Sequence, residues 1–260
     1  MALWTVVPVK ERDRAKERLA PLLSPARRQA LVLAMLEDVL SALAAAPGLA
    51  GSIVVTVDPA ARRLALDHGA RIFEDGARDG HTGAVTAAAR RLAAEDETGM
   101  LTLPGDVPLV TADEIGRIVE AHRSAPSFTI VPSHDEGGSN TILLSPPEAV
   151  PLRFGVDSFH PHLHAATARG IRPTVLRLPG IALDIDNPQD VAAFLRILSQ
   201  TRARALLDES GPLEALLSSS PDLAGPTGPS TLTGNSRGPD HVDAGIKPRR
   251  GGQGQEDFAQ

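Results

Sequence analysis

The chain has 260 residues, of which 42% are hydrophobic and 3% aromatic, and its formal net charge is −6. This length allows one sizeable α/β domain with an appendage, and the acidic balance argues against a general nucleic-acid-binding protein, which is usually basic. The absence of cysteine excludes disulfide bonds, thiolate metal sites and cysteine catalysis. No apolar run approaches the roughly 20 residues of a membrane-spanning helix, so we expect a cytoplasmic protein that binds neither membrane nor nucleic acid.

The first half of the chain alternates short apolar runs with amphipathic segments. Strands are predicted at residues 3–9, 52–57 and 71–73, and helices at residues 25–46, after Asp58-Pro59, and at residues 84–94. A nearly continuous apolar run such as the first is typical of a strand buried on both faces. The alternation predicts an α/β fold of three layers, Rossmann-like, with a mostly parallel central sheet and helices on both of its faces.

A charged segment, residues 10–18, follows the first strand directly and reads KERDRAKER. Such a run is usually a solvated helix face, and that interpretation stays open. The position of the segment gives equal weight to a second interpretation. A basic loop after the first strand of an α/β fold lies where phosphates are held, so the segment is also a candidate anion-binding loop.

Asp106 lies between a predicted central strand and a predicted helix with a strong start signal. It follows an apolar run at residues 100–103 that Pro104-Gly105 ends, and Thr111 with Glu114 forms a capping-box pattern for the next helix. A carboxylate just past the carboxyl end of a central parallel strand lies where open α/β sheets bind ligands. Asp106 is therefore a candidate site residue.

The second half of the chain is predicted to contain a local antiparallel pair of strands. Strands are predicted at residues 128–132, 140–144 and 174–178, an extended segment at 181–185, and helices at 159–169 and 188–202. The predicted domain covers residues 1–205, with a short C-terminal helix within residues 206–218. The Gly-, Pro- and Ser-rich composition of residues 219–260 predicts a disordered tail, because such a segment buries too little apolar surface to offset its ordering entropy.

Asp184 and Asp186 form a second acidic site, in the sequence LDIDNP. Side chains alternate along an extended segment, so both carboxylates point to the same face. Together with Asp106 they offer three hard oxygen ligands, a set suited to Mg²⁺ or Mn²⁺ with substrate phosphates completing the coordination shell. The alternative for the pair is that one of them caps the helix that begins at Pro188.

Six separated motifs resemble, in the right order, the 2-phospho-L-lactate (phosphoenolpyruvate) guanylyltransferase family. They are VVPVKERDRAKERL, LSPARRQALVLAMLEDVL, LPGDVPLV, GGSNTILL, FGVDSF and GIALDIDNPQDV. The resemblance covers about residues 3–200 and implies a nucleotidyltransferase fold. It also implies the activity of that family, which joins GMP from GTP to a phosphorylated three-carbon acid and releases pyrophosphate during synthesis of coenzyme F-420.

The resemblance implies a role for each residue that matches a family motif. Asp106, Asp184 and Asp186 match the metal-binding aspartates, with Mg²⁺ or Mn²⁺ as the cofactor, and Lys10 and Lys16 match a loop that binds the triphosphate. The implied catalytic residues are Lys10, Lys16 and Asp106. The implied nucleotide-binding residues are Pro8, Lys10, Lys16, Gly80, Thr82, Pro104 and Gly105. The implied acceptor-binding residues are Asn140, Gly155 and Ser158.

Some residues carry a second interpretation. Ser158 is also a candidate N-cap of the helix that follows it. The motif GHTGAV at residues 80–85 departs from the common GLNAAV of the family, and Thr82 lacks the two donors of an amide, which leaves the choice of base open. We expect His81 to be an exposed loop residue without a role, with contact to the ribose or a phosphate as the alternative. The histidines at 160, 162 and 164 are not expected to hold a metal, since no acidic fourth ligand is near.

Other activities remain as alternatives. On the same fold they are a sugar or molybdopterin nucleotidyltransferase, or a glycosyltransferase that uses Asp184 and Asp186 as a DxD motif. An inactive nucleotide-binding module is the non-enzymatic alternative, although the retention of all three aspartates speaks against it. The sequence leaves open the choice among phosphoenolpyruvate, 2-phospho-L-lactate and 3-phosphoglycerate as acceptor, and the oligomeric state, a homodimer included.

Overall fold

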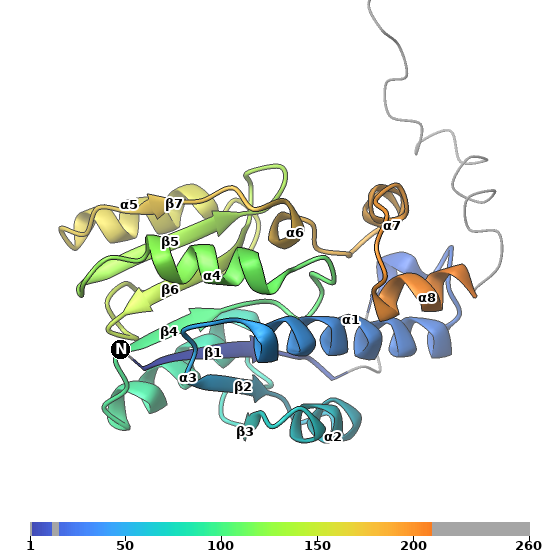
Figure 1. Ribbon diagram of the computed structural model, residues 1–260, viewed down its shortest axis with the longest axis horizontal. Helices are drawn as coiled ribbons and strands as arrows, with labels where there is room; N and C mark the ends of the chain where they lie inside the picture. The colour runs from blue at the N-terminus through green and yellow to red at the C-terminus, as the bar shows by residue number, and fades with distance from the viewer. Residues whose placement is uncertain (1, 12–15, 210–260) are drawn as a thin grey trace, which may run out of the picture. The chain divides into compact units, whose positions relative to one another are not determined.

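The computed structural model describes residues 2–11 and 16–209, arranged as Figure 1 shows. The strands are β1 (Leu3–Pro8), β2 (Gly51–Val55), β3 (Arg71–Phe73), β4 (Gly99–Thr102), β5 (Ser127–Pro132), β6 (Ser139–Ser145) and β7 (Thr174–Val175). The helices are the 3-10 turn η2 (Glu17–Leu19), α1 (Pro25–Ala45), α2 (Pro59–Asp67), α3 (Gly80–Ala94), α4 (Ala112–Ala121), α5 (Phe159–Ala168), α6 (Pro179–Ala182), α7 (Pro188–Leu195) and α8 (Arg202–Asp208).

The seven strands form one mixed sheet in the order β3-β2-β1-β4-β6-β5-β7. β1 pairs in parallel with both β2 and β4, whereas β6 runs antiparallel to β4 and β5. The predicted parallel sheet and the predicted local antiparallel pair are both confirmed. Chain order reverses between β1 and β4, and ligands of open α/β sheets bind at the carboxyl ends of such a pair of strands.

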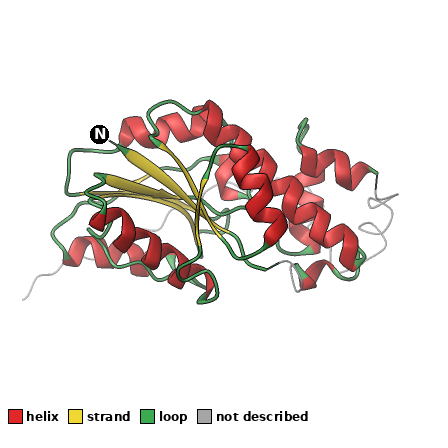
Figure 2. Ribbon diagram, turned by 90° about the horizontal axis from the view of Figure 1, so that it is seen from below, coloured by secondary structure: helices red, strands yellow, loops and turns green. Residues whose placement is uncertain are grey.

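Helices cover both faces of the sheet, as Figure 2 shows. Successive side chains of a strand point to opposite faces, so the adjacent buried residues Val6 and Val7 of β1 join different cores. Val7 belongs to the core beneath α1, α2 and α4, and Val6 to the core beneath α3 and α5. The three layers are therefore held by two separate apolar cores, which matches the predicted fold class.

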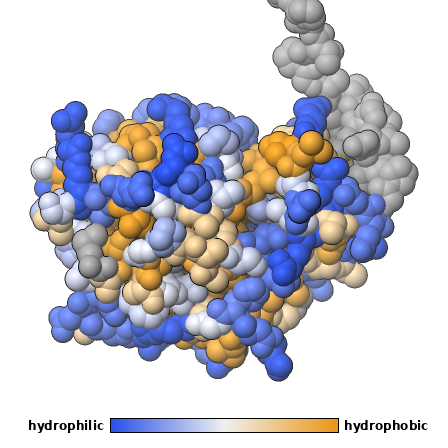
Figure 3. All heavy atoms as spheres, in the orientation of Figure 1, coloured by the Kyte–Doolittle hydropathy of each residue, from blue (hydrophilic) through white to orange (hydrophobic). Residues whose placement is uncertain are grey.

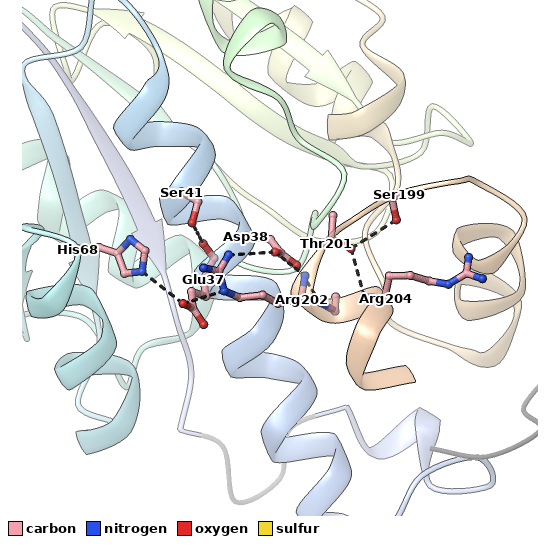
Figure 4. Close-up of polar contacts among 9 residues, drawn as sticks. Glu37, Asp38, Ser41, His68, Ser199, Thr201, Arg202 and Arg204 are labelled. Atoms are coloured by element: carbon pink, nitrogen blue, oxygen red, sulfur yellow. Dashed lines mark hydrogen bonds and ion pairs between the residues drawn. The ribbon is translucent and has the colours of Figure 1, made fainter. Parts of the chain in front are cut away.

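A third core joins α1 to the C-terminal helices α7 and α8, with Leu31 and Met35 of α1 packed among their apolar side chains. Asp38 of α1 strengthens this contact, as Figure 4 shows. Its two carboxylate oxygens accept hydrogen bonds from the backbone N–H groups of Arg202 (2.8 Å) and Ala203 (2.9 Å), the first residues of α8. A carboxylate 164 residues away thus satisfies N–H groups that a helix start leaves without partners.

The single helix predicted at residues 188–202 is wrong. α7 ends at Leu195 and α8 begins at Arg202, with Thr201 accepting from the N–H of Arg204 as its N-cap. Asp38 favours a second helix start at Arg202. The sequence pattern could not indicate this contact, because Asp38 is 164 residues away from Arg202. α8 continues past the predicted domain end at residue 205 to Asp208. Residues 210–218 of the predicted short helix, and the predicted tail, lie outside the described residues.

Three shorter predictions also need correction. α3 begins at Gly80 rather than at residue 84. The prediction missed the first turn of this helix, because that turn lines a cleft and lacks the apolar pattern of a core-facing turn. The strand predicted at 174–178 has two residues, which pair with β5 alone. Residues 181 and 182 are helical, since α6 starts with a proline and Glu114 accepts the N–H of Gly180 at 2.8 Å. The predicted capping box of Thr111 and Glu114 is confirmed.

The described surface mixes polar and apolar residues, as the face drawn in Figure 3 shows. Its exposed large apolar side chains are Leu66, Val156, Ile197 and Leu198. Among the helices of residues 2–11 and 16–209, none is both long and apolar enough to cross a membrane.

We expect Asp38→Ala to lower the free energy of unfolding by about 2 to 3 kcal/mol, because two backbone N–H groups of α8 lose a charged acceptor. Asp208→Ala is the matched control: Asp208 is exposed on the same helix and pairs with Arg204 at i,i+4, so its loss should cost under about 0.5 kcal/mol. Urea unfolding measures both. Equal losses in the two variants would contradict the role given to Asp38.

Candidate active site

A cleft of about 1020 Å³ opens where β1 and β4 end. All residues for which the sequence implied a site role line this cleft: Pro8, Lys10, Lys16, Gly80, Thr82, Pro104, Gly105, Asp106, Asn140, Gly155, Ser158, Asp184 and Asp186. Ligand pockets span about 300–1,000 Å³, so this cleft has room for a nucleotide and a second small ligand. The fold brings residues from both halves of the chain to the topological switch point.

Lys16 connects the two acidic segments of the site. Its ammonium lies 2.6 Å from Asp106 Oδ2 and 2.5 Å from Asp186 Oδ1, residues 90 and 170 positions away in the sequence. Burial opposes the charge of Lys16, but the two carboxylates hold its pKa above the ordinary value. Burial also acts to raise the pKa of Asp106, and the charge and hydrogen bond of Lys16 reverse this effect and hold the pKa below its ordinary value.

Asp184 is placed by Asn140, from β6. The Asn140 amide donates to the carbonyl oxygens of Ile181 (2.9 Å) and Ala182 (3.1 Å) and to Asp184 Oδ1 (3.2 Å). Burial, and then the negative charge of the other two aspartates, raises the pKa of Asp184 to about 6. The amide nitrogen of Asn140 is thus engaged in holding the acidic segment in place.

The alternative that Asp184 or Asp186 caps α7 is wrong. Asn187 is the N-cap, since its side-chain oxygen accepts from the N–H groups of the first turn, and Asp190 completes a capping box. Asp190 also accepts from the backbone N–H of Asp186 at 2.8 Å. The backbone N–H of Ile185 donates to the carbonyl oxygen of Asp106 at 3.0 Å, which ties this segment to the end of β4. Both carboxylates remain available to the cleft.

The aspartates fit a divalent cation by their chemistry. Lys16 pairs with Asp106 and Asp186 alone, and Asp184 adds a third carboxylate nearby, so negative charge is in excess, and carboxylate oxygens are preferred ligands of Mg²⁺. Among the residues that the structure describes, no group of three or more acidic or histidine side chains already encloses a metal position. Mg²⁺ is usually bound by one or two carboxylates together with substrate phosphates, so the donors suit it once Lys16 moves aside.

Residues 155–157 form an exposed lip of the cleft that ends at Ser158. Ser158 occupies the N-cap position of α5, as predicted, but its hydroxyl accepts from the backbone N–H of Ser139 at 3.1 Å and makes no cap bond to the helix. Gly155 has a φ of 149°, a region that favours glycine, and a Cβ at this position would meet no atom within 4 Å. The lip thus combines unusual backbone conformations at Gly155 and Asp157 with exposure at the edge of the cleft.

His81 and Thr82 lie in the first turn of α3, and the prediction that His81 is an exposed loop residue is wrong. Its ring packs on Phe154 with centroids 4.3 Å apart, its Nε2 atom is buried without a hydrogen-bond partner, and burial lowers its pKa to about 4. The Thr82 hydroxyl is bonded to the backbone of Phe154. The sequence motifs did not indicate Phe154 or the buried His162 of α5, because the ring contacts of Phe154 with His81 and His162 form only in the folded chain.

The fold resembles solved nucleotidyltransferases. The CMP:2-keto-3-deoxy-manno-octonic acid synthetase complexed with CTP aligns with a TM-score of 0.50 and 14% identity, covering 80% of this chain and 99% of that one. The 4-diphosphocytidyl-2C-methyl-D-erythritol synthase aligns with a TM-score of 0.52 and 15% identity, covering 80% and 99%. These likenesses show that the chain shares the fold of nucleotide-using transferases of this kind.

The chain belongs to the guanylyl transferase CofC-like family, which residues 3–213 match, and is therefore a guanylyltransferase. It is 39% identical over 193 residues to the phosphoenolpyruvate guanylyltransferase of Rubrobacter xylanophilus, covering 74% of this chain and 93% of that protein. It is 34% identical to the 3-phospho-D-glycerate guanylyltransferase of Colwellia psychrerythraea (75% and 91% covered). It is 32% identical to the 2-phospho-L-lactate guanylyltransferase of Methanothermobacter thermautotrophicus (80% and 90% covered).

Removal of the Lys16 charge tests the geometry of this site. In the absence of divalent cations, we expect Lys16→Met to lower the free energy of unfolding at pH 8 by about 1 to 3 kcal/mol, because partly buried carboxylates lose their counter-ion. Mg²⁺ should then raise the melting temperature of the variant more than that of the wild type. Lys10→Met, in the same cleft but exposed, is the control and should change stability little. A Lys16→Met protein as stable as the wild type would contradict the ion pairs described above.

Proposed function

We propose that this guanylyltransferase transfers GMP from GTP to the phosphate of a phosphorylated three-carbon acid, with phosphoenolpyruvate as the preferred acceptor, in coenzyme F-420 biosynthesis. The observation that carries the proposal is the meeting of Lys16 with Asp106 and Asp186 beside the exposed lip at residues 155–157. The names of the relatives support the acceptor class, and the most identical of those described above is a phosphoenolpyruvate enzyme.

The reaction that this site supports is an in-line displacement. An oxygen of the acceptor phosphate forms a bond to the α-phosphorus of GTP, and the bond from that phosphorus to the bridging oxygen of the β-phosphate breaks, releasing pyrophosphate. A phosphate is already anionic at pH 7, so no general base is required. The chain's own contribution is positioning and charge neutralisation, which act most strongly in a cleft that excludes part of the water.

Each group of residues has a part in this proposal. Asp106, Asp184 and Asp186 are the residues that would bind Mg²⁺ or Mn²⁺, which supplies charge neutralisation of phosphate oxygens when bound. Lys16 leaves the carboxylates and, with the exposed Lys10, turns to the triphosphate. Pro8, Gly80, Pro104 and Gly105 line the nucleotide side of the cleft. The backbone of Gly155 and Ser158 faces the acceptor, and Asn140 holds Asp184.

The substrate assignment is tested by a matrix of four nucleoside triphosphates against phosphoenolpyruvate, 2-phospho-L-lactate and 3-phosphoglycerate. Mass spectrometry detects the diphosphate-linked product, and a coupled assay detects pyrophosphate. We expect GTP with phosphoenolpyruvate to give the highest kcat/KM. Product with another base would overturn the proposed donor, and preference for another acid would overturn the proposed acceptor. A lack of pyrophosphate release would overturn the proposed displacement.

Asp106→Asn should lower kcat on the order of a thousandfold or more, because loss of metal-held charge stabilisation raises the barrier by several kcal/mol. Urea unfolding should show that the variant remains folded. Asp67→Asn, at an exposed position on α2, is the control and should keep full activity. If Asp106→Asn retained more than a tenth of the wild-type rate, Asp106 would not be a metal ligand.

A further inference from the structure

The hydroxyl of Thr82 links two segments that are 72 residues apart. It accepts a hydrogen bond from the backbone N–H of Phe154 at 3.0 Å and donates to the carbonyl oxygen of the same residue at 3.4 Å. A threonine hydroxyl has one donor, and here that donor and one of its acceptor positions serve a single partner residue. The side chain is therefore committed to the protein backbone rather than to the open space of the cleft.

Phe154 is fixed from two further directions by rings. The centroid of the His81 ring lies 4.3 Å from that of Phe154, and the His162 ring makes an edge contact with a centroid distance of 5.2 Å. His162 is itself held firmly, because Nδ1 lies 2.9 Å from Ser139 Oγ and Nε2 accepts the backbone N–H of Arg153 at 2.9 Å. Phe154 thus has a defined position in which three side chains take part.

The lip of the cleft begins at the next residue. Gly155 and Asp157 adopt φ values of 149° and 56°, and Val156 between them is 95% exposed. At its other end the lip is tied down by Ser158, and the N–H of Phe159 donates to the carbonyl oxygen of Gly137 at 3.1 Å. Because residues 155–157 are all exposed, the position of the lip depends on its two ends, and Thr82 holds the first of them.

We propose that Thr82 is a positioning residue for the acceptor: its hydroxyl fixes Phe154, and through it the lip that faces the phosphorylated acid. This inference rests on the proposed function of the lip. Gly80, His81 and Thr82 all line the cleft from the first turn of α3. In the proposed function Gly80 faces the nucleotide, so this one turn would contact the nucleotide through Gly80 and position the acceptor lip through Thr82. Thr82, which departs from the common motif of the family, would then help to set the position of the acceptor relative to the nucleotide.

The test is a set of substitutions at residue 82, with KM for GTP and for the acceptor measured separately at a saturating concentration of the other substrate. Thr82→Val should raise the KM of the acceptor about fivefold to tenfold, the change expected for one lost hydrogen bond. The KM of GTP should stay within about twofold, and kcat within about threefold. Thr82→Ser keeps the hydroxyl and should restore the acceptor KM. Thr167→Val, which removes an exposed hydroxyl on α5, is the control and should change neither constant.

Each contrary outcome has a defined meaning. A rise in the KM of GTP alone would show that Thr82 contacts the nucleotide. That result would overturn the inference and leave the proposed function intact. Failure of Thr82→Ser to restore the acceptor KM, or no change in Thr82→Val, would also overturn it. If Thr82→Val unfolds, Thr82→Ala takes its place with the same expected split between the two KM values. A wild-type enzyme inactive with all three acids would instead overturn the proposed function.

Discussion

The site depends on one electrostatic constraint: three aspartates must lie close together in a partly buried cleft. Like charges at this distance repel, and the raised pKa of Asp184 shows the effect. The ammonium of Lys16 offsets part of the repulsion, because it bonds to Asp106 and Asp186 at once. The proposed cation would carry this compensation further, because a divalent ion among the same carboxylates would offset more of their charge.

The rest of the fold serves to bring these charges together. Asp106 follows β4, in the middle of the sheet, while Asp184 and Asp186 belong to an irregular segment that no β-ladder holds. That segment is fixed instead by side-chain bonds from Asn140 and Asp190 and by packing of Ile185 in the third core. The docking of α7 and α8 on α1, which Asp38 supports, is therefore distant from the chemistry but stabilises one of its two acidic segments.

The two sides of the cleft are also connected mechanically. The first turn of α3 lines the cleft, and through Thr82 and His81 it contacts Phe154, the residue that precedes the lip at residues 155–157. If the lip holds the acceptor as proposed, this contact would help to set the distance between the attacking oxygen and the phosphorus, on which the rate of such a transfer depends.

The sequence by itself determined the α/β class, the position of Asp106 after a central strand, and many of the residues that line the cleft, since hydrophobic periodicity, capping patterns and motifs are local. It did not reveal that Lys16 bridges two aspartates, that Asp38 starts α8, or that Thr82 bonds to Phe154. Each of these contacts joins residues at least 72 positions apart, and the burial that commits His81 to the protein exists only once α3 packs against the loop at Phe154. The tertiary structure alone decided them, because charge pairing and desolvation depend on distance in space and not on distance along the chain.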